Sequence, residues 1–219
     1  MSQIQKETKY TVINKPRFGY PLVSIIVITY NSSKYVLETL ESAKAQTYQK
    51  TELIVSDDCS TDNTVKICRE WIEKYGEGFV RTELITVREN TGISANCNRG
   101  IKAAEGEWMK LIAGDDILLP NCIFDNIDQI IKNNNISFLF SEIHPFSDSQ
   151  EEINSKYFNT KYDFFKLTAI KQFKKLVIEN RIITPSAFLR VETLRKIGGY
   201  DENIRNVEDH PLWIKATKN

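Results

Sequence analysis

The sequence has few cysteines and histidines, the residues that form disulfides or bind a metal through sulfur and nitrogen. Its four cysteines are Cys59, Cys68, Cys97 and Cys122, and no two of them have the C-x-x-C spacing of a zinc or redox site. Only two histidines are present in the 219 residues. So few cysteines at this length do not make a disulfide framework, so we expect reduced thiols and a cytosolic protein.

Long apolar runs and an excess of one charge are also missing. No run approaches the ~18 apolar residues that span a bilayer, and the first twenty residues lack the apolar core of a signal peptide. The 29 basic residues balance 29 acidic ones, which argues against a dedicated nucleic-acid partner. We therefore expect a cytoplasmic protein, or one held peripherally at the inner face of the membrane by something weaker than a spanning helix.

A regular alternation of apolar and amphipathic segments fills the first half of the chain. Strands are expected at 22–28, 52–56, 83–87 and 108–112, and the first of them is a β-branched run typical of a strand buried on both faces. A helix should follow each strand, and the first should carry Val36, Leu37, Leu40 and Ala43 on one face. The pattern predicts an α/β fold with a mostly parallel open sheet flanked by helices on both faces.

Past Pro120 the pattern is looser. Helices are expected at 121–132, 163–179 and 191–197, strands at 136–140 and 182–190, and a last helix around Trp213. The stretch 142–162 has no clear periodicity. Residues 1–20 are expected to form a leader segment, and we expect the natural chain to continue past Asn219.

Polar side chains follow each of the four predicted parallel strands. They are Thr29-Tyr30-Asn31, Asp57-Asp58, Asn90-Thr91-Gly92 and Asp115-Asp116. Ligands of open α/β sheets bind beyond the carboxyl ends of the strands, so two carboxylate pairs should face one crevice. Adjacent carboxylates repel unless a cation or hydrogen-bond donors compensate, and hard oxygen ligands suit Mg²⁺ or Mn²⁺ beside a phosphate.

No glycine-rich phosphate cradle is present to replace such a metal. The chain has no G-x-G-x-x-G after the first strand, no G-x-x-x-x-G-K-[ST] and no G-x-S-x-G. These absences disfavour a dinucleotide-binding site, exclude a P-loop and give no nucleophile elbow. A bound diphosphate would need a metal, and Asp115-Asp116 is the obvious place for it.

Six blocks in this order resemble those of family 2 glycosyltransferases. They are VSIIVITYN (23–31), VSDDCSTDNT (55–64), ENTGISANCNRG (89–100), AGDD (113–116), GGYDE (198–202) and VEDHPLW (207–213). The resemblance covers roughly residues 21–214, nearly the whole chain. It implies the GT-A fold in a single domain over 21–219, with a nucleotide-binding half at 21–118 and an acceptor-side half at 119–219. It also implies a nucleotide-sugar donor, a divalent metal (Mn²⁺ or Mg²⁺) and inversion at the anomeric carbon.

The resemblance also implies roles at matching positions. Thr29 and Tyr30 would pack on the nucleoside, with Asn90 in the same nucleotide-binding set, and Asp58 would accept the base N–H of a uracil-type donor. Asp115 would hold the ribose, and Asp116 would ligate the metal that stabilises the leaving diphosphate. Asp209 would be the general base for the acceptor hydroxyl. Glu208, His210 and Trp213 are candidates for the acceptor side.

Two departures from the family pattern bear on these roles. Cys59 stands where glycine is usual, so the turn after Asp58 should differ in geometry. No Q-x-x-R-W element follows the base motif, which argues against a processive polysaccharide synthase. We expect the transfer of a single sugar, with UDP favoured in the donor and a glycan or lipid-linked precursor as the acceptor.

Plainer interpretations stand beside these. Asp62 is best taken as a turn or N-cap residue, and Trp213 is more often a core residue at helical spacing. The lysines Lys171, Lys174 and Lys175 favour a solvated helix face over an interfacial helix. Two other functions stay open, a nucleotidyltransferase acting on a sugar phosphate and a non-catalytic nucleotide-sugar-binding module. A glycine- and lysine/arginine-rich loop just after the first strand would support the nucleotidyltransferase, and residues 29–34 lack one.

Overall fold

The computed structural model describes residues 19–133, 135–146, 162–204 and 207–218. The predicted leader 1–20 therefore lies outside the described residues, apart from Gly19 and Tyr20, and so does most of the stretch 142–162. Among the helices that are described, none is long and apolar enough to cross a membrane.

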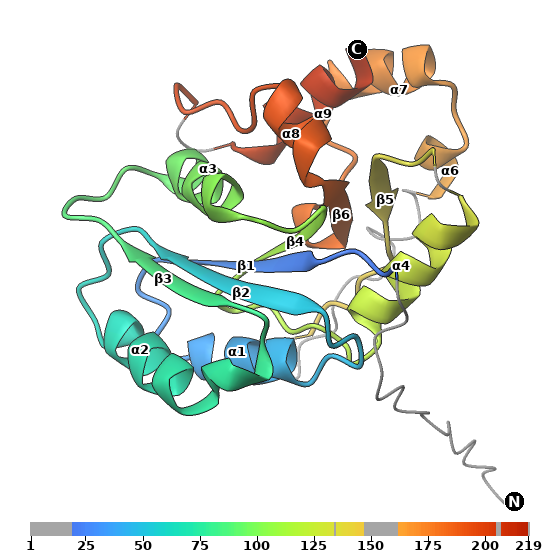
Figure 1. The fold of residues 1–219 in the computed structure, drawn as a ribbon. Helices are drawn as coiled ribbons and strands as arrows, with labels where there is room; N and C mark the ends of the chain where they lie inside the picture. Colours follow the sequence, from blue (N-terminus) through green and yellow to red (C-terminus); the bar gives the residue numbers. More distant parts are fainter. Residues whose placement is uncertain (1–18, 134, 147–161, 205–206, 219) are drawn as a thin grey trace, which may run out of the picture.

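One sheet forms the centre of the described structure (Figure 1). Its strands are β1 (Val23–Thr29), β2 (Thr51–Asp57), β3 (Thr82–Thr86), β4 (Trp108–Ala113), β5 (Phe138–Phe140) and β6 (Ala187–Arg190). They lie in the order β3-β2-β1-β4-β6-β5. β1 pairs in parallel with β2 and β4, and β2 in parallel with β3, whereas β6 runs antiparallel to both β4 and β5. The predicted α/β fold with a mostly parallel sheet is confirmed.

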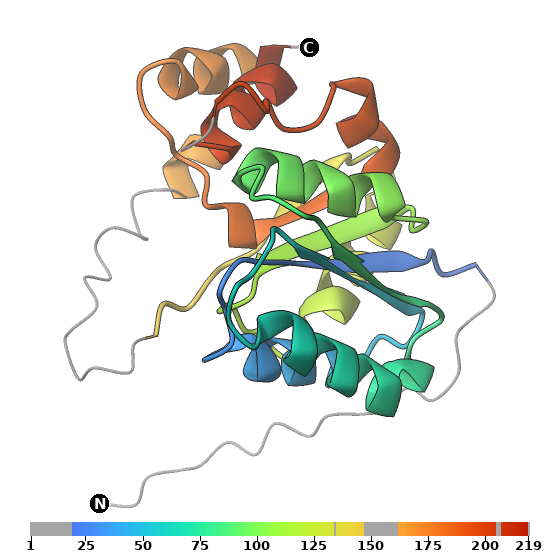
Figure 2. The ribbon, with the colours of Figure 1, turned by 90° about the vertical axis from the view of Figure 1, so that its left-hand side faces the viewer.

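Helices cover both faces of this sheet (Figures 1 and 2). The first layer contains α1 (Val36–Lys44), α2 (Thr64–Tyr75) and α4 (Cys122–Lys132), and the second contains α3 (Ile93–Ala103), α6 (Tyr162–Phe165), α7 (Ala169–Leu176), α8 (Val191–Lys196) and α9 (Asp209–Lys218). Two 3₁₀ turns, Gly76–Gly78 and Thr184–Ser186, complete the elements. Alternate residues of β1 enter the two cores, Ile25 and Val27 the first and Ile26 and Ile28 the second. This explains why the strand is an almost unbroken apolar run.

Three local predictions were wrong. Leu37 is 50% exposed, because it lies about a quarter turn away from the buried row of Val36, Leu40 and Ala43. The helix expected at 163–179 is broken into α6 and α7, since Thr168 has extended backbone. The strand expected at 182–190 is reduced to β6, because residues 184–186 form a 3₁₀ turn around a proline.

A buried carboxylate ties the amino-end edge of the sheet together. Glu52, on β2, is fully buried and accepts hydrogen bonds from Ser24 Oγ (2.5 Å), Arg81 Nη1 (2.7 Å) and the backbone N–H groups of Glu105 (2.6 Å) and Gly106 (3.0 Å). A side chain on Gly106 would come within 2.7 Å of the Ser24 nitrogen, so only glycine fits there. Burial alone would raise the pKa of the Glu52 carboxyl, but these donors outweigh it and hold the pKa below its usual value.

The turn after β2 contains a strained residue. Cys59 has a φ of +67°, in the left-handed region that side chains with a Cβ disfavour. The turn geometry is therefore the one that glycine would allow, and the cysteine adopts it at a conformational cost. The prediction that Cys59 gives this turn a different geometry finds no support in the backbone.

Glu52→Gln should lower the free energy of unfolding by about 1–3 kcal/mol. All the groups around Glu52 donate hydrogen bonds, so the amide NH₂ of glutamine would face other donors and find no acceptor. The folded-state pKa is lowered, so the stabilisation is complete above the unfolded pKa and is lost as the pH falls through the folded pKa. Urea unfolding near neutrality and in mild acid measures both effects. Glu70→Gln, on the exposed face of α2, is the control. A difference between wild type and Glu52→Gln that does not shrink in acid would contradict the assignment.

Cys59→Gly should raise the free energy of unfolding by up to about 1 kcal/mol, because glycine removes the left-handed strain and loses part of that gain to backbone entropy. Thermal unfolding under reducing conditions is the measurement. Cys59→Ser keeps the Cβ and should leave the stability near that of wild type. Equal stability of the glycine and serine variants would argue against strain at this position.

Candidate functional site

The parallel strands bring their polar loops to one edge of the sheet. Residue Thr29 of β1 is in register with Asp57 of β2, and Ile28 with Ala113 of β4. The loops after these three strands therefore start side by side. Both carboxylate pairs therefore lie along one edge of the sheet, but only Asp115 and Asp116 line the cleft described below, so the expectation of one shared crevice is not confirmed.

Asp57 is an internal residue of this edge. It is fully buried and accepts hydrogen bonds from Thr29 Oγ1 (2.7 Å), Ser60 N (2.8 Å) and Ser60 Oγ (2.5 Å). Thr29 is therefore buried with its hydroxyl committed to Asp57. Tyr30, the next residue, is 51% exposed. Of these two residues, Tyr30 is therefore the one that a ligand can reach.

Asp58 holds the loop that leads into α3. Its carboxylate accepts hydrogen bonds from Thr91 Oγ1 (2.7 Å), the N–H groups of Thr91 (3.1 Å) and Gly92 (2.8 Å), and Arg99 Nη2 (2.6 Å). Burial would raise the pKa of Asp58, but these donors lower it, which keeps the carboxylate ionised. Because both oxygens are occupied and the residue is buried, Asp58 has no free acceptor for a base N–H in this arrangement, which corrects the role expected for it. Asn90 is exposed, and its Oδ1 accepts the Gly92 N–H at 3.2 Å.

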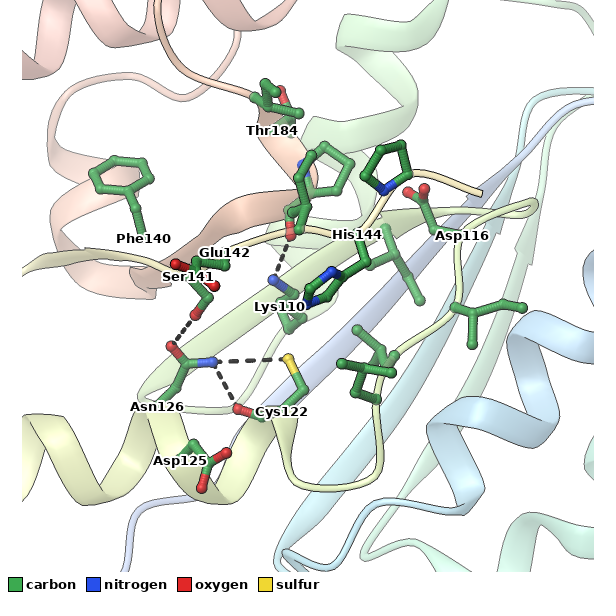
Figure 3. A pocket seen from close by; sticks show the side chains of 18 of the residues that line it. Lys110, Asp116, Cys122, Asp125, Asn126, Phe140, Ser141, Glu142, His144 and Thr184 are labelled. Atoms are coloured by element: carbon green, nitrogen blue, oxygen red, sulfur yellow. Dashed lines mark hydrogen bonds between the residues drawn. The ribbon is translucent and has the colours of Figure 1, made fainter. Parts of the chain in front are cut away.

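One large cleft, of about 1740 Å³, is lined by four of the remaining candidates. Asp115 and Asp116 line it from the turn after β4, and Glu208 and Asp209 line it from the start of α9. Figure 3 shows the part of this cleft that lies between Asp116, Thr184 and α4. Thr29, Tyr30, Asp58 and Asn90 are not among its lining residues. The structure thus brings together the predicted metal ligand and the predicted base, and leaves the predicted nucleoside contacts outside this cleft.

Asp116 combines a turn-forming contact with a partly buried charge. Its Oδ2 accepts the Ala113 N–H at 3.0 Å. Burial raises the pKa of Asp116, and the neighbouring Asp115 raises it further, while the Ala113 N–H and Lys110 oppose the rise. A bound cation would relieve this cost. The described residues contain no cluster of three or more His, Cys, Asp or Glu side chains able to hold a metal by themselves. Mg²⁺ or Mn²⁺ fits such a site if phosphate and water supply its remaining oxygens.

Asp209 is held by two side chains that the sequence did not single out. Asn180 Nδ2 donates to both carboxylate oxygens (3.1 and 3.0 Å), and Thr184 Oγ1 donates to Oδ2 at 3.0 Å. Asn180 is itself fixed, since its Oδ1 accepts the Ile182 N–H. Burial raises the pKa of the neighbouring Glu208, with the charge of Asp209 adding to it. No spacing or motif marks Asn180 or Thr184, because both lie where the sequence periodicity is weak.

Two of the acceptor-side candidates, His210 and Trp213, do not line the cleft. Trp213 is only 1% exposed and packs edge-on against Phe140, at 5.6 Å between ring centroids, so no ring face is open to a sugar. His210 contacts the backbone carbonyl of Leu176 through Nε2, which ties the start of α9 to the end of α7. The burial of Trp213 corrects the expectation that it contacts an acceptor, whereas the acceptor role of His210 stays a prediction.

Lys110 is a further residue of the cleft that sequence analysis missed. It lies in the middle of β4, is almost completely buried, and donates from Nζ to the backbone carbonyl of Pro185. Burial lowers the pKa of Lys110, while Cys122 and Asp116 oppose the change. Because Pro185 follows Thr184, this bond fixes the same 3₁₀ turn that holds Asp209.

Comparison with known proteins agrees with this architecture. A model of the family described as "Glycosyl transferase family 2" matches residues 24–198. The uncharacterized glycosyltransferase MJ1057 of Methanocaldococcus jannaschii is 29% identical over 201 residues, which are 91% of this chain and 66% of that protein. The chain spans even less of several other curated relatives, down to 27% of their length.

Solved structures show the same fold. The S. aureus TarS 1–349 structure in complex with UDP matches with a TM-score of 0.69 and 24% identity, over 89% of this chain and 54% of that one. The mannosyltransferase PcManGT of Pyrobaculum calidifontis, in complex with GDP-Man and Mn²⁺, matches with a TM-score of 0.63 and 21% identity, over 88% of this chain and 50% of that one. These likenesses show the GT-A fold. With the family match over most of its length, the chain belongs to glycosyl transferase family 2.

Proposed function

We propose that this chain transfers a single sugar from a nucleotide-diphosphate donor to an acceptor hydroxyl, with inversion and with the help of a divalent metal. One observation carries the proposal: Asp116 and Asp209 line the same cleft, although one follows β4 in the sheet and the other starts α9 in the outer layer. A sugar displacement needs charge stabilisation for the leaving group and a base for the attacking hydroxyl. The two carboxylates supply one site for each.

The donor is proposed to lie along the edge of the sheet. The exposed side chain of Tyr30 offers a ring for the nucleoside, and Asp115, an exposed residue that lines the cleft, offers a carboxylate for the ribose hydroxyls. Asp58 would act indirectly, by holding the loop at residues 90–92. We favour a UDP-linked sugar, because TarS was solved with UDP and UDP-GlcNAc, while the GDP-Man complex of PcManGT makes GDP the first alternative.

Asp116 would hold the metal, in keeping with the Mn²⁺ complex of PcManGT. When bound, the cation supplies Lewis-acid stabilisation of the diphosphate leaving group. Asp116 is suited to this task because its hydrogen bond with the Ala113 N–H fixes the carboxylate, and its pKa, raised by burial, marks a site where positive charge is favoured.

Asp209 would take the proton of the acceptor hydroxyl. The hydroxyl oxygen then forms the new bond to the anomeric carbon, the bond from that carbon to the diphosphate oxygen breaks, and the proton stays on Asp209. Asn180 and Thr184 direct hydrogen bonds at this carboxylate and so fix its orientation. An ionised carboxylate has about four acceptor positions, which leaves one on Oδ1 for the substrate. The proposed acceptor is a glycan or a lipid-linked precursor, met in the cytoplasm or at the inner face of the membrane.

The first experiment tests the donor and the metal together. Thermal unfolding is followed with UDP, GDP, CDP and dTDP, each with Mn²⁺ and with a chelator. We expect one diphosphate, UDP, to raise the melting temperature only with Mn²⁺; at ~100-fold above its Kd it adds about 2.7 kcal/mol. Asp116→Asn should abolish the shift, and Asp125→Asn, a cleft-lining carboxylate on α4, should keep it. A shift that survives both chelator and Asp116→Asn would refute the assignment of Asp116.

The second experiment tests the base. Asp209→Asn should lower kcat by about 10²–10⁴-fold, because an amide cannot accept the proton, and should leave the UDP-dependent thermal shift unchanged. Thr184→Val should give a smaller loss, and Thr184→Ser, which keeps the hydroxyl, should restore the rate. The measurement is release of nucleoside diphosphate in the presence of a panel of glycan and polyprenyl-phosphate acceptors. If Asp209→Asn turns over like wild type, Asp209 is not the base; if the protein binds donor but transfers to no acceptor, it is a binding module.

A further inference from the structure

An exposed apolar and basic surface lies on α7 and the turn that follows it. Its apolar members are Ile170, Val177 and Ile178, which are 70%, 57% and 84% exposed. Its basic members are Lys171, Lys174 and Lys175, all exposed. We call these six residues the α7 patch. Single exposed apolar residues are ordinary, but three of them within nine positions form a contiguous patch of the kind that marks an interaction site.

The helix geometry puts the patch on one side of α7. Residues 170, 174 and 177 follow the spacing i, i+4, i+7, and residues 171, 175 and 178 follow the same spacing in the neighbouring row. The helical turn continues to the end of the patch, because the N–H of Val177 bonds to Phe173 O and that of Ile178 to Lys175 O. Leu176 faces the other way and is fully buried in the second core. Each row thus combines isoleucine or valine with lysine, away from the core.

The lysines of the patch carry charge that the described residues leave uncompensated. Nearby charges are paired locally, Lys166 with Asp163 at 2.9 Å and Arg181 with Glu179. In the part of the chain that the structure describes, none of the three patch lysines has a carboxylate within ion-pair distance. The patch is therefore cationic as well as apolar. That combination matches a surface with acidic head groups above a hydrocarbon layer.

The patch also lies close to the cleft. α7 packs on α9, as Figure 1 shows, and the Leu176 carbonyl contacts His210. Two residues beyond Ile178, Asn180 binds the carboxylate of Asp209. The segment that carries the patch therefore continues directly into the one that holds Asp209.

We propose that the α7 patch docks this chain on an anionic lipid bilayer, with the isoleucine and valine side chains entering the interface and the lysines meeting acidic head groups. Docking in this way brings the Asp209 end of the cleft to the membrane surface. The acceptor is then a hydroxyl carried by a membrane-bound lipid. This last step rests on the proposed function, whereas docking itself does not.

Co-sedimentation with vesicles, without donor or acceptor, tests the docking. The protein should bind vesicles of phosphatidylcholine containing about a third phosphatidylglycerol, bind pure phosphatidylcholine far more weakly, and dissociate as salt is raised. The triple change Lys171→Gln, Lys174→Gln and Lys175→Gln, and separately Ile178→Ser, should each weaken binding by roughly tenfold or more. A melting temperature equal to that of wild type, measured without ligands, would show that these variants remain folded.

Matched controls lie on the opposite layer of the molecule. Lys44→Gln, Lys66→Gln and Lys74→Gln together remove the same charge from α1 and α2, and Ile131→Ser removes an exposed isoleucine from α4. Both control variants should bind vesicles like wild type.

The proposal is overturned if the protein does not bind anionic vesicles, or if it binds neutral vesicles equally well. It is overturned too if the control variants lose as much vesicle binding as the patch variants. It is also overturned if the chain is a dimer that Ile178→Ser dissociates, since the patch would then be covered by a second copy. Asp116→Asn should bind vesicles normally, so failure of the transferase proposal and failure of docking are distinguishable.

Discussion

β1 pairs in parallel with β2 on one side and with β4 on the other, and this double pairing decides where the polar loops of the first half of the chain lie. The same register that aligns the three strands aligns the turns beyond them, which carry Tyr30, Asp58 and Asp116. At the opposite edge, Glu52 links β1 and β2 to the turn that starts β4, so the register is held where no ligand is expected. The buried Glu52 network and the proposed site thus occupy opposite edges of one sheet.

The sequence predicts the first half of this fold well because local and tertiary preferences agree there. Strands buried on both faces are nearly continuous apolar runs, and each is followed by a helix of clear period. In the second half the outcome depends on contacts between distant segments. The break between α6 and α7 lies at Thr168, whose extended backbone helical periodicity does not reveal, and Phe164 and Leu176 on either side of it enter the same core. The prediction that Leu37 shares the buried face of α1 was wrong for a simpler reason. Leu37 is one position away from Val36, and one position along a helix turns a side chain out of the buried row.

The sequence was enough to select the carboxylates of the candidate site, but it did not reveal the residues that donate hydrogen bonds to them. Motif order is enough to select Asp116 and Asp209, and the fold brings both to one cleft. For two of the carboxylates, a hydrogen-bond donor comes from a distant part of the sequence: Arg99 for Asp58, and Asn180 for Asp209. Such partners are 29 or more positions away along the chain, and only the folded structure shows which carboxylates they engage. That is why Asp58 looked available from the sequence and is enclosed in the structure.

Asp116 and Asp209 are both anchored to β4, but by routes of different length. Asp116 lies in the turn that directly follows β4, whereas Asp209 starts α9 and is bound by Thr184, whose 3₁₀ turn is held at Pro185 by Lys110 of β4. The buried Lys110 side chain therefore acts as a spacer between the proposed metal site and the proposed base. Shortening it is expected to shift Asp209 relative to Asp116 and to leave the loops after β1 and β2 in place.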